Sequence, residues 1–227
     1  MTLQLGYFNS RGYAHPIRQL LFITNQPFEN ITFNTLQEWQ TQKAEILGKD
    51  PKTPFVNLPY LVDEDFFLTE SSAIPDYICH KVNRGELLGK GLKDQARVRE
   101  VLGLAKDLLD SIVNLLFGEG RAEKIKESAG EGGKCRILYK KISAYLAEKE
   151  FLLGYFTYAD LVVSHYVRYA RNYCLSFDAE DPCRRLGNLI EFCKRVDGLP
   201  ELEGFPYDLP YVPEGMIPWF KEFALPQ

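Results

Sequence analysis

The side chain best placed for chemistry near the start of the chain is the phenol of Tyr7. It stands near the end of residues 3–8, which alternate in polarity and are predicted to form a first strand. Residues 9–12 follow as a loop, and Pro16 lies in the first turn of a predicted helix. A phenolic hydroxyl at this place can donate to an anion such as a thiolate, and a charge-assisted bond contributes about 1.5–3 kcal/mol. Such a bond would lower a thiol pKa by about one to two units.

A second stretch suited to binding begins at Asn57, Leu58 and Pro59. Residues 60–62 and 66–68, with an acidic turn between them, are predicted to form a β-hairpin. Proline is tolerated at the first residue of a strand, and it makes a cis peptide bond accessible. A cis bond would turn the N–H and C=O of Leu58 away from the sheet, where they could pair with an extended ligand.

The hairpin is followed by a predicted helix with two serines at its start. Ser71 or Ser72 is predicted to cap this helix before the apolar pattern that includes Ile74. The amide groups and positive dipole end of a helix N-terminus attract an anion. Together with Leu58, this predicts a site for an extended peptide that carries a carboxylate.

The order of elements predicts an α+β fold. Residues 28–33 alternate as a second strand, and residues 34–56 are predicted to be an irregular loop, which at this length is usually functional. The resulting order, β-α-β-α-β-β-α, is complete by about residue 83 and indicates an N-terminal thioredoxin-like domain at residues 1–84. Such domains normally carry redox cysteines after the first strand, but here Tyr7 takes that place.

Beyond a glycine-rich linker at residues 85–91, the helical period dominates. We expect an all-helical domain at residues 92–205 and a C-terminal tail at residues 206–227. A long amphipathic helix ends near residue 117, and residues 118–133 are either a mobile connection or a short helix. Further helices are expected at residues 134–149, 157–172 and 184–196.

One internal motif has a clear structural meaning. Thr157 and Asp160 have the spacing of a capping box, with Asp in place of Glu. We therefore predict that these two residues start a buried helix and take no part in catalysis.

Composition narrows the class of protein. The chain has 227 residues and a formal net charge of −4, which argues against nucleic acid or an anionic membrane as the main partner. No apolar run approaches the length of a membrane span, and the first residues lack the pattern of a signal peptide. The five cysteines are odd in number and lack metal-ligand spacing. We expect a cytoplasmic protein with free thiols and no metal.

The N-terminal sequence LGYFNSRGYAHPIRQLL and the later NLPYLVDEDFFLTESSAI resemble those of cytosolic glutathione transferases of the mu or sigma type. The resemblance covers residues 3 to about 205, and Gly154, Thr157, Ala159 and Asp160 match a signature of the helical domain. It implies a homodimer that transfers the sulfur of glutathione, its co-substrate, to electrophilic small molecules in detoxification, with no other cofactor.

The resemblance also implies roles for individual residues. Tyr7 would be the catalytic residue that stabilises the thiolate, and Arg11 and Arg18 are near enough in sequence to add positive potential, although both could serve the fold instead. The glycine end of glutathione would be held by a tryptophan and a lysine; Lys43 fits the pattern, and Lys49 and Lys52 are alternatives. The full glutathione set is Phe8, Trp39, Lys43, Asn57, Leu58, Pro59, Glu70 and Ser71, and the expected second-substrate pocket contains Tyr13, Leu109, Phe117 and Trp219.

Two other functions stay open on the sequence. Phe8 replaces the tryptophan usual in mu-type enzymes, which is nearer the sigma pattern and allows a glutathione-dependent isomerase of a lipid endoperoxide. The stretch from Asn57 to Tyr60 favours the mu type. A non-catalytic structural or interaction subunit is the third possibility, because residues 118–133 and the tail are unusual.

Overall fold

The computed structural model describes residues 2–49, 55–116, 119–206 and 208–211. The described chain divides into two compact units. The first contains residues up to Gly85 together with residues 201–206 and 208–211, and the second is Glu86–Pro200. Residues 201–205 were predicted to belong to the helical domain, but they join the first unit because the Phe205 ring packs against α1 (His15–Ile23).

The first unit is built on a four-stranded mixed sheet of order β2-β1-β3-β4. Strands β1 and β2 are parallel, and β3 is antiparallel to both β1 and β4. This arrangement, with the helices that follow it, confirms the α+β class and the thioredoxin-like order. The elements are β1 (Leu3–Phe8), a 3-10 turn (Gly12–Ala14), α1 (His15–Ile23), β2 (Phe28–Phe33), α2 (Leu36–Lys49), β3 (Tyr60–Asp63), β4 (Phe66–Thr69) and α3 (Ala73–Lys81).

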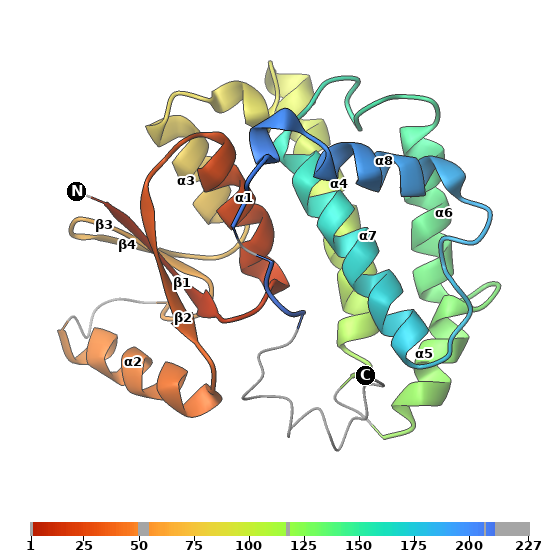
Figure 1. Ribbon diagram of the computed structural model, residues 1–227, viewed down its shortest axis with the longest axis horizontal. Helices are drawn as coiled ribbons and strands as arrows, with labels where there is room; N and C mark the ends of the chain where they lie inside the picture. The colour runs from red at the N-terminus through yellow and green to blue at the C-terminus, as the bar shows by residue number, and fades with distance from the viewer. Residues whose placement is uncertain (1, 50–54, 117–118, 207, 212–227) are drawn as a thin grey trace. The chain divides into compact units, whose positions relative to one another are not determined.

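The two faces of the sheet are covered by different helices. Helices α1 and α3 lie together on one face and α2 lies on the other (Figure 1). Leu5 pairs with Leu61, and both side chains are fully buried. Gly6 pairs with Tyr60, whose ring lies 2.1 Å from the place where a Cβ on residue 6 would stand. The aromatic ring thus fills the space that glycine leaves.

Helix α2 corrects the expectation of an irregular loop at residues 34–56. Most of its residues are polar, so its sequence gives a weak amphipathic signal. Trp39 and Ile46, two turns apart, pack with Phe33 and Tyr60 in a hydrophobic cluster on the sheet. Tertiary packing of an apolar stripe stabilises helices whose own propensity is modest. The packing of this stripe therefore accounts for the helix.

The second unit is helical and includes the region left undecided by the sequence. Residues 118–133 were expected to be either a mobile connection or a short helix, and they contain a short helix, α5. Helix α7 packs against both α4 and α8, and no helix among the described residues is long and apolar enough to cross a membrane. The helices are α4 (Leu92–Val113), α5 (Arg121–Ala129), α6 (Lys134–Leu146), α7 (Tyr158–Ser176) and α8 (Gly187–Asp197), with 3-10 turns at Gly85–Leu88 and Pro200–Leu202.

The capping box at the start of α7 is confirmed. The Thr157 N–H donates to one carboxylate oxygen of Asp160 at 2.7 Å, and the Leu152 N–H donates to the other at 2.8 Å. Asp160 is fully buried, so its carboxylate joins the chain before α7 to the first turn of that helix.

Candidate functional site

Tyr7 lies on β1, which is paired on both sides, and its side chain is 7% exposed. The backbone N–H of Tyr13 donates to the Tyr7 hydroxyl oxygen at 3.2 Å. A phenolic oxygen can accept one hydrogen bond while its proton is donated elsewhere. The contact with Tyr13 therefore orients the Tyr7 hydroxyl without using its donor.

Gly12 is packed directly against this hydroxyl. Its φ is +37°, and a Cβ at residue 12 would stand 2.5 Å from the Tyr7 oxygen. Both the backbone conformation and the missing side chain therefore suit glycine alone. Gly12 was predicted to lie in the loop after the first strand, and this contact gives it a role that the sequence pattern did not show.

We predict that Gly12→Ala destabilises the protein by about 1–3 kcal/mol, because the new methyl group overlaps the Tyr7 ring. Urea unfolding measures this, and turnover should fall with it as the hydroxyl is displaced. Gly103→Ala is the matched control, since nothing lies within 4 Å of its added Cβ and α4 would gain about 0.5–1 kcal/mol. Equal stability changes in the two variants would contradict the packing argument.

Arg18 holds the loop after β1 from inside the fold. Its fully buried guanidinium donates to the carbonyl of Ser10 at 2.7 Å, to the carbonyl of Phe8 at 3.3 Å and to the side chain of Asn30 at 3.0 Å. Its central carbon lies 5.9 Å from the centre of the Tyr7 ring. Arg18 thus serves the fold while placing a positive charge beside Tyr7.

The Leu58–Pro59 peptide bond is cis, the form that the proline makes accessible. Pairing between β1 and β3 ends at Gly6 and Tyr60, so Leu58 lies just outside the ladder. Pro59 is buried and Leu58 half-buried, whereas Asn57 is exposed.

The entry to α3 differs from the expected serine cap. Ser72 stands at the N-cap position but its side chain makes no capping hydrogen bond. Its backbone is in the helical region, whereas a capping serine normally has extended geometry. The carbonyl of Glu70 instead accepts from the N–H groups of Ala73 and Ile74, each at 3.0 Å.

Glu70 itself has a left-handed backbone with φ of +77°. This conformation is uncommon outside glycine, and such residues cluster at ligand and catalytic sites. The Glu70 side chain is exposed and the adjacent Ser71 is half-buried. A carboxylate, a hydroxyl and the start of a helix therefore lie together after β4.

Trp39 and Lys43 both lie on α2. The Trp39 side chain is 7% exposed, and its ring stacks on Tyr60 with centres 6.2 Å apart. The indole thus has a packing role that the sequence did not show. Lys43, one turn later, is half-buried; Lys49 is exposed at the end of α2, and Lys52 lies outside the described residues.

The residues expected to bind a second substrate come from both units of the chain. Tyr13 is half-buried beside Tyr7, and Leu109 is buried on α4. Phe117 and Trp219 lie outside the described residues.

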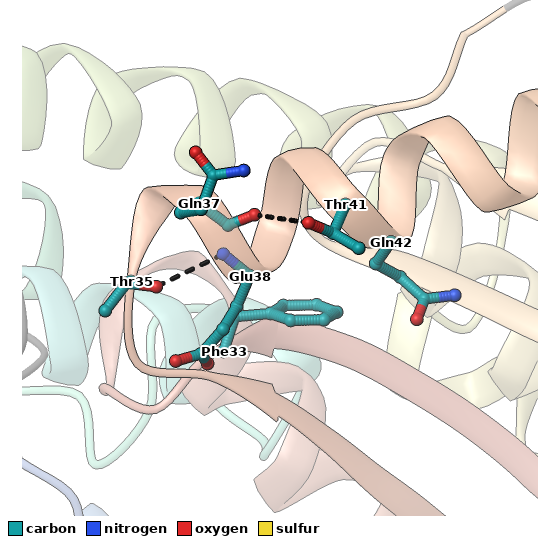
Figure 2. A pocket seen from close by; sticks show the side chains of 6 residues that line it. All are labelled: Phe33, Thr35, Gln37, Glu38, Thr41 and Gln42. Carbon is teal, nitrogen blue, oxygen red and sulfur yellow. Dashed lines mark hydrogen bonds between the residues drawn. The ribbon is translucent and has the colours of Figure 1, made fainter.

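Two hollows flank α2. The first has a volume of about 380 Å³; along it the Glu38 N–H donates to Thr35 and the Thr41 hydroxyl donates to the carbonyl of Gln37 (Figure 2). The second, of about 360 Å³, lies over the sheet and includes Lys49. Of Lys43 and Lys49, the two candidate lysines within the described residues, Lys49 lines the second hollow and Lys43 lines neither. The first is lined by Phe33, Thr35, Gln37, Glu38, Thr41 and Gln42, and the second by Gln4, Gln42, Ile46, Lys49, Tyr60, Val62, Glu64, Asp65 and Phe67.

The chain is similar in sequence to known proteins. The family described as "Glutathione S-transferase, N-terminal domain" matches residues 3–80. "Glutathione S-transferase Mu 2" of Macaca fuscata fuscata is 30% identical over 235 residues, covering 99% of this chain and 98% of that protein. "Glutathione S-transferase B" of Cavia porcellus is 29% identical over 238 residues, covering 98% and 97%.

Solved structures agree on the fold. The rat protein in "rat hPGDS complexed with a quinoline" has a TM-score of 0.76 and 22% identity, covering 92% of this chain and 98% of its own. At that identity the likeness concerns the fold alone. The sequence relatives, however, are similar over nearly the whole chain, and both are named glutathione S-transferases. The chain therefore belongs to the glutathione S-transferase family.

Proposed function

We propose that this transferase joins the sulfur of glutathione to an electrophilic carbon of an apolar small molecule. The observation that carries the proposal is the oriented hydroxyl of Tyr7, which Tyr13 and Gly12 hold at the end of β1. The hydroxyl donates to the glutathione thiolate and lowers the thiol pKa by about one to two units. A larger fraction of the bound thiol is then ionised at neutral pH, and the thiolate is the nucleophile.

The peptide part of glutathione is proposed to lie along the residues around Leu58 and α3. The main chain of Leu58, between Asn57 and Pro59, pairs with the cysteinyl residue. The Glu70 carboxylate attracts the ammonium group of the γ-glutamyl end, and Ser71 with the start of α3 binds its carboxylate. Support comes from the position of Leu58 beyond the ladder and from the left-handed backbone of Glu70.

The glycine end is proposed to meet α2. Lys43 is the preferred partner for its carboxylate, because it stands one turn after Trp39 and is half-buried. Trp39 shapes this end through its packing on Tyr60, and Phe8 contributes an apolar wall beside Tyr7, with ring centres 5.8 Å apart. Tyr13, Leu109, Phe117 and Trp219 remain the proposed contacts of the electrophile.

The working form is proposed to be a cytoplasmic homodimer engaged in detoxification. Phe55 supports the dimer, since its large apolar side chain is 72% exposed on the single chain. Burial against a second copy would remove this surface from water. The isomerase and the non-catalytic subunit are not favoured by the relatives, which are named as transferases.

Glutathione binding is tested with Glu70→Gln. Replacing the carboxylate by an amide removes its charge while keeping its shape, so the KM for glutathione should rise by about tenfold with a smaller change in kcat. Conjugation of an aryl halide with varied glutathione gives both constants, and calorimetry with S-methylglutathione gives the affinity directly.

Glu64→Gln is the matched control, because Glu64 is also an exposed glutamate with a left-handed backbone, at φ +58°. Its KM should match the wild type. A wild type that neither binds glutathione nor turns over the aryl halide would remove the proposed function and leave the non-catalytic subunit.

A further inference from the structure

The described residues 201–206 and 208–211, here called the strap, lie against α1 in the first unit. The Phe205 ring meets His15 and Phe22 edge to face, with ring centres 5.5 and 5.4 Å apart. Figure 1 shows the strap running beside α1 after the 3-10 turn Pro200–Leu202. It therefore reaches back, across almost the whole sequence, to the helix that follows the Tyr7 loop.

Residues 208–211, at the end of the strap, bind Arg11 through its main chain and its side chain. The Arg11 backbone N–H donates to the carbonyl of Pro210 at 2.8 Å, and its Nε donates to the carbonyl of Leu209 at 2.6 Å. The guanidinium also contacts Asp208 at 2.5 Å and the Tyr211 hydroxyl at 3.3 Å, and lies 4.7 Å from the Tyr211 ring centre. Both the main chain and the side chain of Arg11 are thus fixed by one short segment.

The hydrogen bonds from Arg11 to the carbonyls of Leu209 and Pro210 contribute most to holding Arg11 against the strap. The Asp208 side chain is 94% exposed, and exposed ion pairs contribute little because water screens them. The Arg11 side chain is 20% exposed, so the bonds from Nε and the backbone N–H are better shielded. The guanidinium presents five N–H donors in a fixed planar arrangement, whereas the ammonium group of a lysine is a compact charge with three.

Arg11 is joined directly to the parts that orient Tyr7. Gly12, the next residue, packs on the Tyr7 hydroxyl, and the N–H of Tyr13 donates to it. The Arg11 carbonyl accepts from the His15 N–H at 2.8 Å, which ties the loop to α1. The buried Arg18 side chain donates to the Ser10 carbonyl of this loop, and the strap binds the same loop through Arg11.

We propose that the strap, by gripping Arg11, positions the Tyr7 hydroxyl toward the glutathione thiol. Arg11 is a positioning residue in this arrangement, and the C-terminal segment sets the fraction of thiolate in the site. The proposal rests on the proposed function for its kinetic consequence, but the position of the loop can be measured without turnover.

The test compares Arg11→Ala, Arg11→Lys and Phe205→Ala in the full chain. Loosening the strap should raise the pKa of bound glutathione by about one unit, which slows kcat/KM by about tenfold at pH 6.5. The rates should approach those of the wild type near pH 9, where the thiol is ionised without help. Arg11→Lys should fall between wild type and Arg11→Ala, and Phe205→Ala loosens the strap without changing a residue of the loop.

The matched control is Glu191→Ala, which breaks an exposed ion pair with Lys194 on α8 and should leave the pH profile unchanged. A general loss of rate at every pH, with no shift of the profile, would overturn the proposal. Should Arg11→Ala fail to fold, Phe205→Ala and Arg11→Lys still distinguish a shift of the pH profile, which supports the proposal, from a uniform loss of rate, which overturns it.

A second measurement separates this proposal from the proposed function. Amide hydrogen exchange of Tyr13 should be faster in Phe205→Ala than in the wild type, whether or not glutathione binds. Unchanged exchange at Tyr13 rejects the strap as a positioning element. A wild type without glutathione binding would reject the proposed function instead, and the exchange data would still decide the role of the strap.

Discussion

Tyr7→Phe is expected to slow conjugation of an aryl halide by about ten- to a hundredfold at pH 6.5. The change removes one charge-assisted hydrogen bond of about 1.5–3 kcal/mol to the thiolate, and with it the acceptor of the Tyr13 N–H, while the ring stays in its buried place. Affinity for glutathione should be kept, because the peptide contacts lie around Leu58, Glu70 and Ser71. The pKa of bound glutathione, followed by thiolate absorbance, should rise toward that of the free thiol.

Tyr155→Phe is the control for loss of a phenolic hydroxyl. Tyr155 belongs to the helical unit and donates to Asp94 at 2.7 Å, so conjugation should continue at the rate of the unaltered enzyme. Full activity in Tyr7→Phe would move the catalytic role elsewhere. Ser10, whose side chain is buried after β1, is then the first alternative.

Asp160→Ala is expected to lower the free energy of unfolding by about 2–4 kcal/mol. The substitution removes the acceptor of the Leu152 and Thr157 amide groups, and a buried donor left without a partner costs about 1–3 kcal/mol. Urea unfolding at pH 7 measures the loss. A change below 0.5 kcal/mol, of the size usual for surface substitutions, would contradict the role of this acid at the start of α7.

This difference should also depend on pH. Burial raises the pKa of Asp160 to about 6, although the hydrogen bonds from Leu152 and Thr157 act in the opposite direction. Since the pKa in the unfolded chain is lower, the folded protein binds more protons between about pH 4 and 6. The contribution of Asp160 to stability therefore falls as pH rises through this window. The gap between wild type and Asp160→Ala should be larger at pH 5 than at pH 7.

The features predicted well from sequence depend on a few adjacent residues. The spacing of Thr157 and Asp160 predicted the capping box, and Pro59 indicated that a cis bond was accessible after Leu58, because each signal lies within four residues. The hairpin of β3 and β4 was also predicted, because its two strands and turn are consecutive in the sequence.

The features that were missed depend on contacts distant in sequence. Helix α2 is stabilised by the packing of Trp39 against Phe33 and Tyr60. These contacts join different elements, so the spacing of apolar residues within α2 does not predict them. The Glu70 carbonyl replaced the serine cap because its left-handed backbone directs it at two amides. The grip on Arg11 joins residues about 200 positions apart, which single-sequence patterns do not report.

The burial of the cysteines has a consequence for an enzyme that handles alkylating agents. All five thiols of the chain are buried, and burial raises the pKa of Cys183 to about 12 and that of Cys193 to about 11. At pH 7 only about one in 10⁵ Cys183 side chains and one in 10⁴ Cys193 side chains are ionised. Since the thiolate is the reactive form, Cys183 and Cys193 are poor nucleophiles compared with a glutathione thiol held beside Tyr7. We expect these two buried thiols to escape alkylation by the electrophiles that the enzyme joins to glutathione.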